Sequence, residues 1–175
     1  MHFSERFLAH RNARALADLT QSYLPLFPEL HPVDFELDLL PYSSRYLGLT
    51  DHDRQPPRVR LRPARLTNPS LTYTIPHELT HLIQRPLGAA PMGERACDLH
   101  AMARAGLRFL VPPGYLRVPD AAKTDWRRWS PSATALAREA LRQREEGRRT
   151  YIGWWESSFG GLVRALSDVS AAESP

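Results

Sequence analysis

The stretch Thr74-Ile-Pro-His-Glu-Leu-Thr-His-Leu-Ile83 decides how the fold of this chain is interpreted. Apart from two histidines and one glutamate it carries no titratable side chain, and its apolar residues recur at the spacing of one helical face. Residues four apart on a helix lie about 40° from each other, so His77 and His81 can turn their imidazoles toward one metal ion. The stretch therefore predicts a largely buried helix that carries a pair of metal ligands.

Glu78 follows the first histidine and completes a His-Glu-x-x-His pattern. Neutral imidazole nitrogens suit zinc, which takes four ligands in a tetrahedral arrangement. Glu78 can reach the open position of such a site without being a ligand, and there it would take a proton from the water that zinc activates. After attack on a peptide carbonyl it would hand the proton to the leaving nitrogen. The pattern predicts zinc as the cofactor and Glu78 as the catalytic base.

A catalytic zinc needs a third protein ligand, and the stretch Gly93-Glu-Arg-Ala-Cys-Asp-Leu-His-Ala101 offers the candidates. Glu94 and Asp98 lie one turn apart on one helical face, whereas His100 lies about 120° away from Glu94. The residues alone leave Glu94, Asp98 and His100 open as the third ligand. We expect Cys97 to be a buried structural thiol, because two histidines and one acidic ligand already complete a catalytic site.

The motif and its uncharged flanks resemble the zincin metallopeptidases. The Glu-x-x-x-Asp pattern of Glu94 and Asp98 resembles the glutamate helix of the gluzincins, and it is similar to the Glu-x-x-Ala-Asn/Asp-x-Phe-Ala stretch of the ImmA/IrrE-type regulatory peptidases. The resemblance implies that Glu94 is the third zinc ligand and that Asp98 orients His77. The chain departs from the thermolysin-like branch in its short spacing between the motif and Glu94, which favours a small gluzincin.

Hydrophobic periodicity predicts an α+β fold in a single domain over residues 1–169, followed by a flexible tail at residues 170–175. The motif helix should begin near Thr72 or kink at Pro76, because proline is comfortable only in the first turn of a helix. The other predicted elements are a helix over 4–23, a three-stranded meander of 33–39, 45–50 and 58–62, a helix from Glu94 to about Phe109, a helix over 133–146 capped by Ser132, and a helix over 151–166.

The resemblance also implies how a substrate would bind. In zincins a small sheet precedes the motif helix, and its edge strand binds the substrate backbone as an additional strand. The strand over 58–62 is closest in sequence to the motif and is the predicted edge. A hydrogen-bond donor to the oxyanion is also expected. The candidates for that role are His100, Tyr151, Tyr115 and Tyr73.

Composition narrows the class of protein and its compartment. The 175 residues are 42% hydrophobic and 24% charged, which is the balance of an ordinary globular protein. The single cysteine excludes an internal disulfide and predicts a reducing, cytoplasmic compartment, and no stretch approaches the length of a membrane span. The net charge of +4 is spread along the chain, so contact with nucleic acid is only weakly supported. Trp126 and Trp129 are interpreted as loop anchors rather than as base-stacking residues.

Taken together, the residues predict a zinc endopeptidase that acts on a protein or peptide substrate in the cytoplasm. The rival interpretation is a non-catalytic, zinc-stabilised interaction module, such as one partner of a toxin–antitoxin or DNA-associated regulatory pair. Glu78 favours the enzyme, because a purely structural zinc site has no use for a base and usually closes its fourth position.

Overall fold

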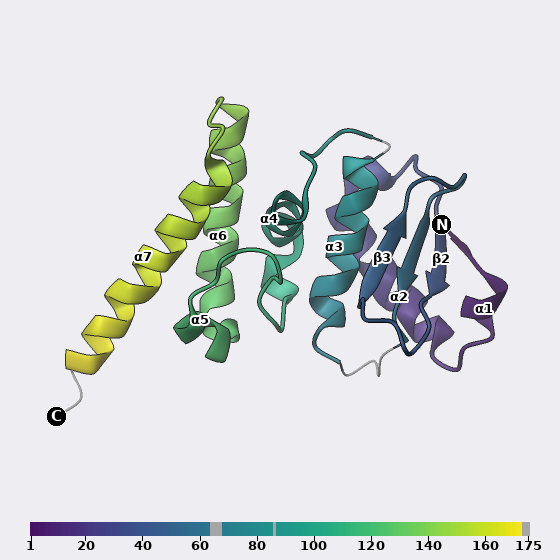
Figure 1. Cartoon of the computed structure of the whole chain (residues 1–175), viewed down its shortest axis with the longest axis horizontal. Coiled ribbons are helices and arrows are strands. Elements are labelled where there is room, and N and C mark those ends of the chain that lie inside the picture. The colour runs from purple at the N-terminus through teal and green to yellow at the C-terminus, as the bar shows by residue number, and fades with distance from the viewer. Residues whose placement is uncertain (64–67, 86, 173–175) are drawn as a thin grey trace.

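The computed structural model describes residues 1–63, 68–85 and 87–172 and has an α+β fold, as predicted. Its sheet has four strands. In Figure 1 the helix labelled α3 (Leu71–Gln84) lies between this sheet and the C-terminal helices. β1 and β4 both run parallel to β2, and β3 runs antiparallel to β4. In spatial order the strands are β1 (His2–Phe3), β2 (Glu36–Leu39), β4 (Arg58–Leu61) and β3 (Gly48–Asp51).

The predicted meander, with 58–62 at its edge, is wrong. β4 lies inside the sheet between β2 and β3, so β3 is the strand at the edge. The interior position tolerates the arginines of β4 because neighbouring strands supply their partners. Arg58 lies 2.9 Å from Glu36, and Arg60 lies 3.7 Å from Asp51. The two-residue strand β1 is too short to be recognised from a pattern.

The predicted N-terminal helix over 4–23 is divided into α1 (Glu5–Leu8) and α2 (Ala13–Tyr23). At the break, the backbone N–H of Asn12 donates to His10 Nδ1 over 3.2 Å. Such a local side-chain bond competes with the helical hydrogen bond and ends the first helix. Two short 3₁₀ turns, η1 (Leu24–Leu26) and η2 (Pro28–Leu30), follow α2.

The motif helix is α3 (Leu71–Gln84), and it contains Pro76 well inside its length. Pro76 has no N–H, so the carbonyl of Thr72 loses its helical donor. The hydroxyl of Tyr23, at the end of α2, takes that place and lies 3.3 Å from the Thr72 oxygen. A side chain from another helix thus satisfies the backbone where the proline interrupts it. α3 packs between the sheet and the next helix, which explains why most of it is buried.

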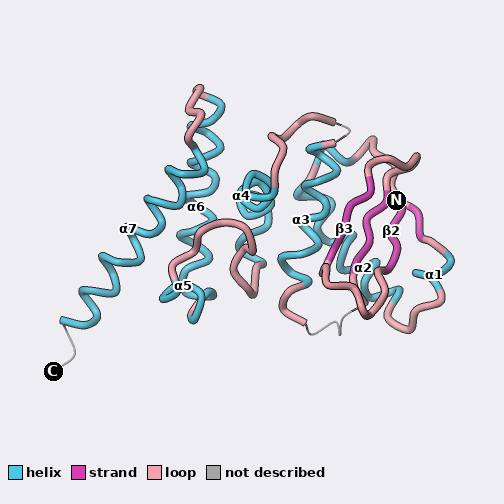
Figure 2. The backbone as a smooth tube through the Cα atoms, in the orientation of Figure 1, coloured by secondary structure: helices cyan, strands magenta, loops and turns pink. Residues whose placement is uncertain are grey.

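The C-terminal part stacks helices outward from α3 (Figure 2): α4 packs on α3, α6 on α4, and α7 on α6. α6 begins before the predicted start, so Ser132 is not its cap. Its early turns bury Trp126 and Trp129 against Phe159 of α7, at ring distances of 6.3 and 6.4 Å. The elements are α4 (Glu94–Ala105), η3 (Gly106–Arg108), α5 (Asp120–Thr124), α6 (Trp126–Glu145) and α7 (Tyr151–Ala172).

The described helices include none that combines the length and the apolar character of a membrane span. The helix α7 continues to Ala172, so part of the segment predicted as a flexible tail is helical. The end of that predicted tail, residues 173–175, lies outside the described residues.

Tyr23→Phe should lower the free energy of unfolding by about 1 kcal/mol, because it leaves the Thr72 carbonyl without its donor inside the structure. The aromatic ring, which packs 5.2 Å below the Arg108 guanidinium, is preserved by this change. Urea unfolding followed by circular dichroism would measure the loss. Tyr42→Phe is the matched control, since Tyr42 is 70% exposed. Equal stability of the Tyr23 variant and wild type would contradict this account of the proline.

Candidate metal centre

Three side chains from two helices converge on one point. His77 and His81 lie one turn apart on α3, and Glu94 is the first residue of α4. His77 Nε2 and His81 Nε2 lie 3.1 and 3.4 Å from the same oxygen, Glu94 Oε2. Ligands of a tetrahedral zinc, bound at about 2.0–2.1 Å, are spaced about 3.3 Å apart. The distances from Glu94 to the two histidines are thus those of neighbouring ligands around one ion.

Asp98 lies one turn after Glu94 on α4 and is completely buried. Its Oδ1 lies 2.8 Å from His77 Nδ1 and accepts a hydrogen bond from the Tyr73 hydroxyl over 2.7 Å. Its Oδ2 accepts from the backbone N–H groups of Tyr115 and Leu116 over 2.6 and 3.2 Å. Asp98 therefore fixes the ring of His77 so that Nε2 faces Glu94.

His81 is oriented by a residue that sequence reasoning missed. Its Nδ1 lies 2.7 Å from Gln84 Oε1, and the Gln84 amide donates to the carbonyls of Pro91 and Gly93. The segment before Glu94 is in this way connected to the end of the motif helix. Each histidine has a hydrogen-bond acceptor on Nδ1, which leaves Nε2 for a metal.

Cys97 offers a second set of donors. The ligand atoms of His77, His81 and Cys97 lie within 4.8 Å of one another, and these three residues could hold a metal ion. However, Cys97 Sγ lies 3.1 Å from the His77 carbonyl oxygen, and burial raises the pKa of the thiol to about 12. Glu94 is the better third donor, because hydrogen bonding to His77 lowers the pKa of its carboxyl and keeps it ionised.

The charges around His77 favour a cation between the histidines and Glu94. Burial lowers the pKa of His77, but hydrogen bonds to Asp98, Cys97 and Glu94 together outweigh burial and raise it overall. In the metal-free protein the His77 ring is therefore protonated on both nitrogens, which face the carboxylates of Asp98 and Glu94. Burial and the nearby charge of His77 lower the pKa of His81, so that ring stays neutral. A metal ion at Nε2 would displace the proton there.

Glu78 lines the same hollow as His77, His81 and Glu94 and contacts the sheet. Its carboxylate accepts a hydrogen bond from the Thr50 hydroxyl over 2.7 Å and packs against Gly48 of β3. A Cβ atom at Gly48 would lie 2.6 Å from Glu78 Cγ, so only glycine leaves room for this carboxylate. Burial raises the pKa of Glu78 to about 7, which suits a group that accepts and returns protons near neutral pH.

A cleft runs past Glu78 and consists of two adjoining hollows of about 280 and 250 Å³. The first extends along β3 toward His52, His81 and Glu94. The second extends in the opposite direction, toward the residues before β3. Both are lined by Tyr46, Gly48, His77, Glu78 and Tyr115. The predicted base and the first histidine therefore stand in the middle of a groove whose wall is the edge strand.

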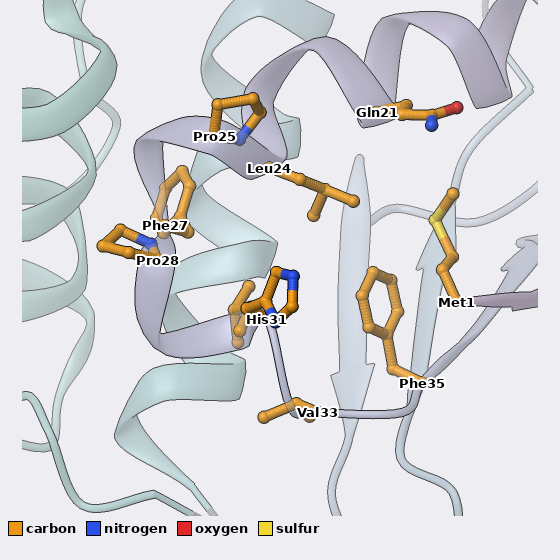
Figure 3. A pocket seen from close by; sticks show the side chains of 10 residues that line it. Met1, Gln21, Leu24, Pro25, Phe27, Pro28, His31, Val33 and Phe35 are labelled. Atoms are coloured by element: carbon orange, nitrogen blue, oxygen red, sulfur yellow. The ribbon is translucent and has the colours of Figure 1, made fainter.

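A larger hollow of about 600 Å³ lies elsewhere, between α2, the 3₁₀ turns and the first strands (Figure 3). Its wall is mostly apolar, with side chains such as Leu24, Phe27 and Phe35, and His31 is its one titratable side chain. None of the candidate metal ligands or Glu78 lines it. The chemistry of the molecule is therefore assigned to the smaller cleft.

Of the four predicted oxyanion donors, Tyr115 lies in the cleft with a hydroxyl that has no hydrogen-bond partner among the described residues. Tyr115 lines both hollows and stacks on His77, with ring centres 5.6 Å apart. The hydroxyl of Tyr73 is bonded to Asp98 instead. His100 and Tyr151 do not line the cleft: His100 is buried beside Arg104, and Tyr151 lies at the start of α7.

His52 is a further residue of the cleft that the sequence did not suggest. It follows the last residue of β3, and its ring lies 6.3 Å from the ring of His81. No spacing relates it to the motif, because the sheet brings it there.

Comparisons with protein-family models, curated proteins and solved structures gave no match to this chain.

Zinc titration of single-site variants should separate the two donor sets. Glu94→Ala should lose zinc almost entirely, whereas Cys97→Ala should bind it within about threefold of wild type, and Asp98→Ala about 10- to 100-fold more weakly because one ring is freed. His100→Ala is the control outside the cleft and should bind normally. Retention of zinc by Glu94→Ala together with its loss from Cys97→Ala would make Cys97 the third ligand.

Glu78→Gln should stabilise the metal-free protein at pH 8, by about 1–3 kcal/mol, and much less at pH 5. The pKa of Glu78 is raised from 4.5 to about 7 in the folded state, so its ionisation favours unfolding. This penalty is absent below pH 4.5, grows as the pH rises through the window between these two values, and is complete above pH 7. Urea unfolding with a chelator present, at both pH values, would measure it.

Glu94→Gln is the matched control for this experiment. The pKa of Glu94 is lowered in the folded state, so its ionised form contributes stability above the unfolded pKa that is lost as the pH falls. The control should therefore destabilise the metal-free protein at pH 8, opposite in sign to Glu78→Gln. The same sign for both variants would contradict the assigned electrostatics.

Proposed function

We propose that this protein is a zinc-dependent endopeptidase of gluzincin type. The observation that carries the proposal is the convergence of His77 Nε2 and His81 Nε2 on one oxygen of Glu94, at 3.1 and 3.4 Å. Glu78 lines the same cleft but is bonded to Thr50, so it is available as a base rather than as a ligand. A purely structural zinc site has no need of such a carboxylate.

In this proposal His77, His81 and Glu94 hold the zinc. When bound there, zinc supplies a Lewis acid that polarises a peptide carbonyl and makes a water molecule lose a proton near neutral pH. Glu78 accepts that proton and delivers it to the leaving nitrogen. Its pKa of about 7 in the metal-free protein allows both transfers. Asp98 keeps the proton of His77 on Nδ1, so that the nitrogen facing Glu94 stays a ligand.

The edge strand β3 supports a peptide as the substrate. Among the described strands it pairs only with β4, so one of its sides is open to another strand. Gly48, Leu49 and Thr50 of this strand also line the hollow that contains the histidines. An extended peptide added to β3 would run past Glu78, with its backbone held by main-chain hydrogen bonds.

Tyr115 is assigned as the donor to the developing oxyanion. Its ring stacks on His77, its side chain is half exposed to the cleft, and its backbone N–H is bonded to Asp98. The carboxylate that orients the first histidine therefore also positions the segment that carries this hydroxyl. A hydrogen-bond donor that is already in position before the reaction stabilises an oxyanion most effectively.

The second candidate function is a non-catalytic zinc module, and the position of Cys97 is the observation that favours it. A Cys97 thiolate together with His77 and His81 would supply three ligands of a structural site. Against this stand the raised pKa of the thiol, about 12, and its hydrogen bond to the helix carbonyl. An open cleft beside Glu78 is equally unnecessary for a structural site.

Wild type loaded with zinc should cleave labelled casein or members of a quenched fluorescent peptide library, and a chelator should abolish the activity. Glu78→Gln should retain zinc and lose about 100- to 10,000-fold in kcat, the usual contribution of a general base. Tyr115→Phe should lose about 10- to 1,000-fold in kcat with little change in KM. Tyr42→Phe serves as the control outside the cleft. Full activity in Glu78→Gln would sink the proposed mechanism.

A further inference from the structure

The hollow of about 250 Å³ beside Glu78 is lined by Thr74, whose hydroxyl is buried. Thr74 is 3% exposed, and its Oγ1 has no hydrogen-bond partner among the described residues. The other threonines of α3 behave differently: the hydroxyls of Thr72 and Thr80 donate to the carbonyls of Pro69 and Pro76 over 2.6 and 2.8 Å. A buried hydroxyl without a partner is costly. Thr74 lines the hollow, but its Oγ1 has almost no accessible surface, so a ligand there bonds to it only after the Thr74 side chain rotates toward the hollow.

A cation stands in the lining of the same hollow. The guanidinium of Arg45 lies 4.8 Å over the ring of Tyr46 and donates to the Tyr46 hydroxyl over 2.6 Å, so its position is held by the neighbouring ring. In the part of the chain that the structure describes, Arg45 makes no ion pair with an acidic residue. The lining contains one carboxylate, and that is Glu78 itself.

The walls of the hollow leave it accessible from the groove. Gly48 and Gly114 contribute only backbone on two sides, and a Cβ atom at Gly114 would already lie 3.1 Å from the Tyr73 hydroxyl. The hollow adjoins the Glu78 carboxylate, so a side chain within it belongs to a residue next to the bond being cleaved. Its polar lining includes Arg45, Tyr46 and Thr74 in addition to the site residues Tyr73, His77, Glu78 and Tyr115.

We propose that this hollow is the subsite for an acidic substrate side chain, glutamate or aspartate, adjacent to the scissile bond; the proposal rests on the metallopeptidase function. A carboxylate there would accept charge-assisted hydrogen bonds from Arg45 and a further bond from the Thr74 hydroxyl. A lysine or arginine side chain would instead place a second cation beside Arg45. The subsite therefore selects by charge as well as by shape.

The test is cleavage of a positional library of quenched fluorescent peptides in which each position in turn is Glu, Gln or Lys. At one position beside the cleaved bond, Glu should exceed Gln by about 10-fold in kcat/KM, mostly through KM. Arg45→Ala should abolish this preference, and Arg45→Glu should shift it toward Lys. Arg85 lies near His52 of the cleft but lines neither hollow. Arg85→Ala therefore removes a positive charge near the cleft and should keep the preference for Glu.

Thr74→Val separates a role in binding from a role in folding. The valine has nearly the same shape and removes a hydroxyl that has no partner in the free protein, so thermal stability should be unchanged or higher. Cleavage of the Glu peptide should nevertheless fall about 3- to 10-fold, and by more than cleavage of the Gln peptide, because the hydrogen bond to a charged acceptor is the stronger one. Identical kinetics of Thr74→Val and wild type on both peptides would overturn the assignment of Thr74.

A binding measurement distinguishes failure of the subsite from failure of the proposed function. Fluorescence anisotropy would follow the labelled Glu and Gln peptides with zinc-loaded Glu78→Gln, with and without Arg45→Ala. Cleavage without a preference for Glu leaves the peptidase and overturns the subsite. Absence of any cleavage overturns the peptidase, and the subsite then depends on binding: tighter binding of Glu that Arg45→Ala removes supports it, and equal binding overturns it.

Discussion

The buried carboxylate of Asp98 is the interaction on which the rest of the site depends. An ionised group with no exposure to water is tolerated only when several donors surround it. Asp98 obtains them from two separate parts of the chain: Tyr73 and His77 on α3, and the backbone N–H groups of Tyr115 and Leu116. Their distances are fixed by hydrogen bonds to one carboxylate, so the helices that carry the candidate ligands and the segment that carries Tyr115 cannot shift independently.

The same burial that makes Asp98 an anchor gives the neighbouring groups their unusual charge states. Burial of α3 between the sheet and α4 raises the pKa of Glu78 to about 7. The pKa of His77 is raised because a carboxylate faces each of its two nitrogens. Functional sites commonly combine burial with a few specific charge partners in this way. The apolar hollow near the N-terminus has no comparable group of partners, although it is larger.

Local patterns were enough to predict the α+β class, the motif helix and the adjacent helix that begins at Glu94. They also predicted that Glu94 and Asp98 share a face, because helical spacing depends only on nearby residues. The order of the strands and the presence of His52 in the cleft could not be predicted, since both follow from pairing between distant segments. The early start of α6 was missed because Pro131 signals a break, whereas Ser130 donates to the carbonyl that the proline frees.

The helix α4 connects the candidate metal site to the C-terminal helices α6 and α7. One face of this helix supplies Glu94 and Asp98, and the helix also packs against α6 and α7. A ligand that binds only the folded state stabilises every part of the structure that unfolds together with its binding site. If a metal ion binds at the candidate site, its occupancy and the docking of the last two helices are thus thermodynamically linked. Removal of such an ion would then loosen helices that make no contact with it.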